Sequence, residues 1–171
     1  ALYFASQVQD KGKVFVYEFI PSNLKILRQN IALNPSYENV VDVVTNPVWE
    51  KSDLETYYLD NGPGSKVSFE PGPDMKDKVK TLSIDDLVNQ KKLDKVDFIK
   101  MDIEGAEPYA LKGAAETIKK FRPTLAIAIY HSLSDMANIP KWINELGVGY
   151  QFYLGHYTIH QEETILFAVP K

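Results

Sequence analysis

The sequence predicts an α/β protein with a mostly parallel sheet, helices on both faces of the sheet and an antiparallel C-terminal hairpin. Three observations lead to this fold class. Short β-branched and aromatic runs alternate with helical patterns along the chain. The run 124–130 is almost entirely apolar, as in a strand covered on both faces. The last two strand-like segments, 149–154 and 164–169, are too close in sequence for a parallel connection.

The composition indicates one globular domain over residues 1–171. The chain has 44% hydrophobic and 25% charged residues, and a chain of this length buries roughly 70% of its unfolded surface in one core. It has no cysteine, which excludes disulfides and thiolate chemistry and is compatible with a cytoplasmic location, the one we expect.

The net charge and the hydropathy pattern limit the classes of partner that the chain could bind. The net charge is −4 and the lysines are scattered, which disfavours nucleic-acid binding. The longest apolar run is far shorter than the about 20 residues of a membrane-spanning helix, so no membrane partner is expected. Oligomeric state is left open by the sequence.

The first elements form a strand–helix–strand unit. Residues 13–20 predict a buried strand that ends at Glu18. Pro21 begins a helix with an apolar face, and an Asn-Pro pair ends that helix. A strand over 40–45 follows, and we expect it to be parallel to the first through a right-handed crossover.

Residues 50–80 differ from the rest of the chain because they are charged and rich in Gly and Pro. They contain weak strand signals near 55–59 and 66–70, and we interpret them as a variable insertion or hairpin over the sheet. A strand is expected over 79–84, and Ser83 begins the next helix with a capping-box-like pattern.

The most strongly patterned part of the chain begins at Val96. A strand over 96–101 leads into the Asp-Ile-Glu-Gly stretch that starts at Asp102, and a helix is expected over 107–120. A helix from about 134 to 146 follows the apolar strand 124–130. Its expected buried residues are Met136, Trp142, Ile143 and Leu146.

Four segments in this order resemble the FkbM family of S-adenosylmethionine-dependent methyltransferases. The resemblance covers nearly the whole chain except 50–80. It implies a Rossmann-like class I methyltransferase sheet and transfer of a methyl group from S-adenosylmethionine to a hydroxyl of a small molecule or glycan, of the sugar or polyketide type. The segments are Tyr17 to Asn23, Ile99 to Glu107, Tyr130-His131 with Asp135 and Ile139-Pro140, and Glu163-Thr164.

The family opens with a central strand and a Gly-rich turn that cradles the methionine part of the cofactor. Residues 1–6 look like the helix that follows that turn. We therefore expect the sequence to be N-terminally incomplete, beginning after these two features.

Two candidate cofactor-binding residues follow the first two strands, at the strand ends where ligands of open α/β sheets bind. The Glu18 carboxylate could accept both hydroxyls of an adenosine ribose, and the alternative is a solvated strand-end glutamate. Asn46 could approach the adenine edge, although Asn-Pro is also a common start of a turn.

Two carboxylates follow the strand 96–101. Asp102 and Glu104 are expected to flank the sulfonium of the cofactor, and Asp102 could also orient the acceptor hydroxyl. The alternative is that Glu104 caps the next helix. Lys100 points to the same side of the strand as Asp102, and because a buried lysine needs a partner we expect a structural or second-layer role.

His131 is the predicted general base, and Asp102 the second catalytic residue. A neutral imidazole at a strand end could take the hydroxyl proton during methyl transfer, while the alternative is a core histidine. His156 and His160 are expected in the hairpin connection, at the surface or the substrate rim. Asp102, His131 and His156 could also hold a divalent metal on ligand type, but no metal site is predicted.

Two other function classes stay open. A non-catalytic relative of the fold, acting as a binding or interaction module, would explain a missing Gly-rich turn. A nicotinamide-dependent oxidoreductase would require a parallel final strand.

Overall fold

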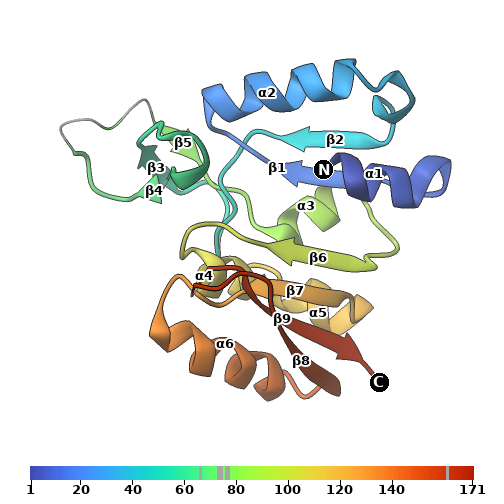
Figure 1. The fold of residues 1–171 in the computed structure, drawn as a ribbon, viewed down its shortest axis with the longest axis vertical. Helices are drawn as coiled ribbons and strands as arrows, with labels where there is room; N and C mark the ends of the chain where they lie inside the picture. The colour runs from blue at the N-terminus through green and yellow to red at the C-terminus, as the bar shows by residue number, and fades with distance from the viewer. Residues whose placement is uncertain (66, 73–74, 76–77, 161) are drawn as a thin grey trace. The chain divides into compact units, whose positions relative to one another are not determined.

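The computed structural model has a mixed α/β fold and describes residues 1–65, 67–72, 75, 78–160 and 162–171 (Figure 1). The chain divides into two compact units, which are described separately. The first unit comprises residues 1–47 and 53–81, and the second comprises 48–52 and 82–171. Among the described residues, no helix has both the length and the apolar character needed to cross a membrane.

The first unit begins with the predicted helix and strand–helix–strand pattern. Helix α1 covers Leu2–Val8, strand β1 Val14–Tyr17, helix α2 Pro21–Ala32 and strand β2 Val41–Val44. Strands β1 and β2 are parallel, with Val14 opposite Val41, as predicted. The residues of β1 are half-buried rather than buried. Short 3₁₀-helices, Gln9–Lys11 and Pro35–Tyr37, follow α1 and α2.

The rest of the first unit is a three-stranded antiparallel sheet in the order β4-β3-β5. Strand β3 covers Glu55–Tyr58, β4 Val67–Ser68 and β5 Val79–Lys80, with a 3₁₀-helix at Gly62–Gly64. The predicted hairpin is confirmed, although residue 66 of its second strand lies outside the described residues. The strand predicted over 79–84 is wrong in length, because the Ser83 side chain accepts a hydrogen bond from the Asp86 amide and caps the next helix.

The second unit contains a four-stranded sheet in the order β6-β7-β9-β8 (Figure 1). Strands β6 and β7 are parallel, whereas β9 runs antiparallel to both β7 and β8. This confirms the predicted C-terminal hairpin. The bounds are Ile84–Gln90 for helix α3, Phe98–Met101 for β6, Thr124–Ala128 for β7, Leu133–Glu145 for helix α6, Tyr150–His156 for β8 and Thr164–Pro170 for β9.

The single helix predicted over 107–120 is two helices, α4 at Glu107–Lys112 and α5 at Ala115–Phe121. The Asp85 carboxylate accepts hydrogen bonds from the first amides of α5, at 3.1 Å from Glu116 N and 2.7 Å from Thr117 N. The Gly113 carbonyl accepts a bond from the Asp85 amide (2.8 Å). These contacts with α3 break the helix at Gly113.

Strand β7 is covered on both faces, as its apolar run predicts. Leu125 and Ile127 belong to the main core, whereas Ala126 and Ala128 pack with Ile165 in a second cluster. Alternate residues of a strand point to opposite faces, so the two clusters lie on the two sides of the sheet.

Helix α6 buries a different set of residues from the predicted one. Ile143 is buried, and Trp142 and Leu146 are half-buried. Met136 is 42% exposed, so its predicted burial is wrong. Asp135 and Ile139 are buried instead, because with Ile143 they form an i, i+4, i+8 row on one face of the helix.

Candidate functional site

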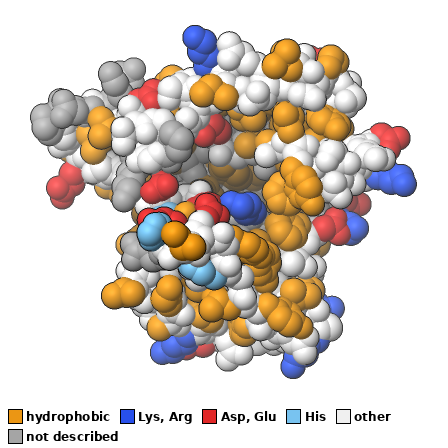
Figure 2. Space-filling model, in the orientation of Figure 1, with side chains coloured by type: hydrophobic (Ala, Val, Ile, Leu, Met, Phe, Trp, Pro, Cys, Tyr) orange, Lys and Arg blue, Asp and Glu red, His pale blue; other side chains and the backbone are white. Residues whose placement is uncertain are grey.

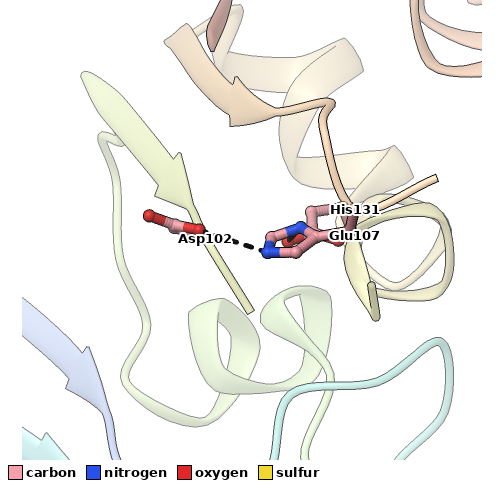
Figure 3. Close-up of side chains that lie close together, drawn as sticks. All are labelled: Asp102, Glu107 and His131. Carbon is pink, nitrogen blue, oxygen red and sulfur yellow. Dashed lines mark ion pairs between the residues drawn. The ribbon is translucent and has the colours of Figure 1, made fainter. Parts of the chain in front are cut away.

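A group of three carboxylates and one histidine lies in the second unit where β6 and β7 end. We call Asp102, Glu104, Glu107 and His131 the carboxylate–histidine cluster. Asp102 directly follows β6, and His131 lies just beyond β7, so the two parallel strands bring them to the same edge of the sheet. Figure 2 shows acidic side chains beside a histidine on the viewed face, and Figure 3 shows the His131 ring facing Asp102, with Glu107 overlapping the ring in this view.

A tight turn between β6 and α4 positions the cluster. Glu104 and Gly105 both have positive φ, 58° and 93°, a backbone conformation that glycine adopts freely and glutamate does not. The Ile103 amide donates a 2.7 Å hydrogen bond to Oε1 of Glu107. This bond closes the turn and draws the Glu107 side chain inward, where it has 0% exposure.

The His131 ring has carboxylate oxygens near both of its nitrogens. Nδ1 lies 3.1 Å from Oε1 of Glu107. Nε2 lies 3.7 Å from Oδ1 of Asp102 and 3.9 Å from Oε2 of Glu104. The side chain is only 10% exposed, and its ring centroid is 4.2 Å from that of Tyr130. Among the described residues, neither ring nitrogen has a hydrogen-bond partner.

Asp102 is an accessible carboxylate, with 25% of its side chain exposed. The Tyr130 hydroxyl donates a 3.0 Å hydrogen bond to its Oδ1. Burial of Tyr130 and this bond to the carboxylate raise the pKa of the phenol well above its usual range. Tyr130 therefore stays a hydrogen-bond donor at neutral pH and helps to orient Asp102.

Lys100 has the expected partner but not the expected environment. Its Nζ lies 3.4 Å from Oδ2 of Asp102, and 45% of its side chain is exposed. The assumption of a buried strand was wrong at this position, because only alternate residues of β6, Ile99 and Met101, are buried. An exposed pair of this kind stabilises the fold by at most about 1 kcal/mol.

Two buried carboxyl groups near His131 have raised pKa values. Burial raises the pKa of Glu107, against the opposing effects of hydrogen bonds from the Ile103 amide and its own amide and of the charge on His131. Burial likewise raises the pKa of Asp135, which is 6% exposed, again against the charge on His131. His131 thus interacts with acidic groups from the β6–α4 turn, from α4 and from α6.

The residues that could hold a metal differ from the set considered from ligand type. Among the described residues, one donor atom each from Asp102, Glu107 and His131 lie within 4.8 Å of one another, so Glu107 takes the place of His156. His156 is the last residue of β8 rather than part of the connection, and its Nδ1 is 2.9 Å from Oγ1 of Thr164. His160 is exposed, as expected.

The two other candidate cofactor residues lie in the first unit, after β1 and β2. Oε1 of the half-buried Glu18 accepts a 2.9 Å hydrogen bond from the Ile20 amide. Nδ2 of Asn46 donates a 2.8 Å bond to the Lys80 carbonyl. Their contacts to a cofactor stay predictions.

Sequence reasoning placed Asp102, Glu104 and His131 at strand ends, and the structure brings these three together. It missed Glu107 and Asp135, which are both buried. A glutamate in the first turn of a helix usually interacts with the helix dipole at the surface. Only the repeated acid in Asp-Ile-Glu-Gly-Ala-Glu could have drawn attention to Glu107.

Comparison with known proteins gives two positive results. The family model described as Methyltransferase FkbM domain matches residues 1–152. The crystal structure of Methyltransferase FkbM from Methylobacillus flagellatus KT is similar with a TM-score of 0.74 and 26% sequence identity, over 98% of this chain and 40% of that chain. The present chain thus spans well under half the length of that protein. No curated protein matches the chain significantly.

Proposed function

Because this chain belongs to the FkbM methyltransferase family, we propose that it transfers a methyl group from S-adenosylmethionine to a hydroxyl oxygen of a small molecule or glycan, of the sugar or polyketide type. We also propose a Rossmann-like sheet for the whole domain. The parallel pair β6–β7 and the antiparallel hairpin β8–β9 support it.

The proposal rests on one observation. The imidazole of His131, whose side chain is 10% exposed, lies among carboxylates. A sugar-type hydroxyl has a pKa far above neutrality, so its proton needs an acceptor as the new bond forms. His131 is the proposed base, with Nε2 on the side of Asp102 and Glu104. When bound, S-adenosylmethionine supplies an electrophilic methyl carbon, whose bond to sulfur breaks as the hydroxyl oxygen attacks.

The acidic side chains suit both partners of this reaction. Asp102 is accessible and could accept a hydrogen bond from the acceptor hydroxyl, which would fix the direction of attack. The negative charges of Asp102 and Glu104 would also favour a cationic donor. The chemistry of this donor set therefore fits the proposed cofactor.

Glu18 and Asn46 are proposed to bind the adenosine part of the cofactor. One oxygen of Glu18 accepts the Ile20 amide, but a carboxylate has about four lone-pair sites, so it can still accept ribose hydroxyls. Asn46 uses Nδ2 for the Lys80 carbonyl, and its amide oxygen could accept a hydrogen bond from an adenine edge.

A divalent cation is the second candidate for activating the hydroxyl. Asp102, Glu107 and His131 offer the mixed carboxylate and imidazole donors that such ions accept. A metal would lower the pKa of a bound hydroxyl and would make a histidine base unnecessary. Full activity after exhaustive treatment with EDTA would exclude this candidate.

Calorimetry with S-adenosylhomocysteine tests the cofactor, using the full-length protein and Glu18→Ala. We expect binding to the wild type and at least tenfold weaker binding to the variant. Incubation with S-adenosylmethionine and a panel of sugar and polyketide alcohols then tests transfer, read as the mass gain of one CH₂. Absence of cofactor binding would favour a non-catalytic binding module.

A further inference from the structure

We propose that Glu107 is a positioning residue that holds His131 in the Nδ1–H tautomer, so that Nε2 carries the free lone pair on the side of Asp102. This inference rests on the proposed function for its consequence in catalysis. The tautomer itself can be tested without donor or acceptor.

In the contact between Glu107 and His131, the glutamate oxygen is the hydrogen-bond acceptor. Oε1 of Glu107 already accepts the 2.7 Å hydrogen bond from the Ile103 amide, so this oxygen is an acceptor. The same oxygen lies 3.1 Å from Nδ1 of His131. Nδ1 must then be the donor. A proton on Glu107 is favoured on the other oxygen, Oε2, because the carbonyl oxygen of a carboxylic acid is the better acceptor for the Ile103 amide.

A hydrogen bond between Glu107 and His131 would also satisfy polar atoms that are buried. Oε2 of Glu107 and both ring nitrogens of His131 are buried without a hydrogen-bond partner among the described residues, and leaving such a group unpaired destabilises the fold. The distance from Nδ1 to Oε1 is that of a hydrogen bond. Catalytic hydrogen bonds are often long or poorly aligned before substrate binds and tighten in the complex.

The shortest contacts of the His131 ring favour this arrangement over a metal centre. The nearest oxygens of Glu107 and Asp102 face different ring nitrogens, Nδ1 and Nε2. An imidazole presents one nitrogen to one ion, so at most one of these two shortest contacts could be shared with a cation, although one donor atom each from the three residues lie within 4.8 Å of one another. The two contacts instead form a chain from a buried carboxylate through the ring to an accessible carboxylate. Glu104 also faces Nε2, and Asp135 adds negative charge from α6.

The test is ¹⁵N NMR of the histidine side chains at a pH where the ring is neutral. The chain has three histidines, and His131→Gln assigns the signal. We expect a protonated Nδ1 and an unprotonated Nε2 in the wild type. Glu107→Gln should keep this tautomer, because its amide oxygen can still accept from Ile103 and Nδ1. Glu107→Met removes the acceptor and should shift the ring toward the Nε2–H tautomer.

Kinetics provides the second readout. Glu107→Met should lower kcat about 100-fold with little change in KM. Glu107→Gln should retain most of the activity, and the exposed control Glu116→Gln should behave as wild type.

An Nε2–H ring in the wild type would overturn the proposal, even if Glu107→Met fails to fold. So would an unchanged tautomer in a folded Glu107→Met, or a loss of activity on chelation. Failure of the proposed function would instead leave the tautomer as expected with no methyl transfer.

Discussion

The Nδ1 atom of His131 lies 3.1 Å from Oε1 of Glu107, whose side chain has no exposed surface. This pair connects the first residue of α4 to the loop after β7. It places the imidazole between a buried carboxylate and the accessible Asp102, so the two ring nitrogens have different environments.

His131→Ala should abolish turnover while leaving the affinity for S-adenosylhomocysteine nearly unchanged. Loss of a general base lowers kcat by typically 10²–10⁴-fold. Single-turnover methyl transfer and calorimetry measure the two quantities, with the exposed His160→Ala as control. Equal losses of kcat and of folding stability would show that His131 is a core residue.

Gly113→Ala should destabilise the second unit by about 2–3 kcal/mol through overpacking. A Cβ atom there would lie 2.2 Å from the Trp49 carbonyl oxygen and 3.0 Å from Cα of Glu50, and neither backbone atom can move independently. Urea unfolding measures the change. The control is Gly64→Ala, whose nearest contact would be 3.6 Å, and a similar loss in both variants would contradict this explanation.

Ser83→Ala should lower the free energy of unfolding by about 1 kcal/mol. The Ser83 hydroxyl accepts the Asp86 amide at the start of α3 (3.1 Å), and loss of such a cap leaves a helical N–H unpaired. Ser6→Ala is a suitable comparison, because the Ser6 hydroxyl donates to the Tyr3 carbonyl and accepts from the Gln7 side chain at an exposed site. Thermal or urea unfolding measures the change in both variants. Equal changes would show that Ser83 does not act as a helix cap.

Asp135→Asn should become more stable relative to the wild type as the pH rises from about 3 to neutrality. Burial raises the pKa of Asp135 in the folded state above its ordinary value of 3.8. Between these two pKa values the folded state binds more protons than the unfolded state, so wild-type stability falls as the pH rises. The variant lacks this loss, which amounts to about 1.4 kcal/mol for each unit of pKa shift.

Urea unfolding of both proteins at several pH values measures this difference. A difference that stays constant, or that grows in favour of the wild type with rising pH, would show that the Asp135 carboxylate is stabilised in its charged form.

Much of the fold was predictable because its signals are local. Pro21 marks the start of α2, Ser83 caps α3, and the short connection between 149–154 and 164–169 requires an antiparallel pair. Each of these depends on residues within a few positions of one another. The candidate residues Asp102, Glu104 and His131 were predictable for a related reason, since residues that follow parallel strands meet at one edge of the sheet.

Other features depend on segments far apart in the sequence. The break between α4 and α5 is fixed by the contacts of Asp85, which lies far from 107–120 in the sequence. The phase of α6 that buries Asp135 and exposes Met136 depends on where the helix packs.

The alternation of strands and helices, the final hairpin and the acidic turn after β6 were therefore determined by short-range preferences of the chain alone. Tertiary structure decided which of those acidic groups lost contact with water. Glu104 and Glu107 are indistinguishable as residue types, yet Glu107 is fully buried against His131 while a third of the Glu104 side chain stays exposed. Burial depends on atoms brought from distant segments, and burial raises the pKa of Glu107.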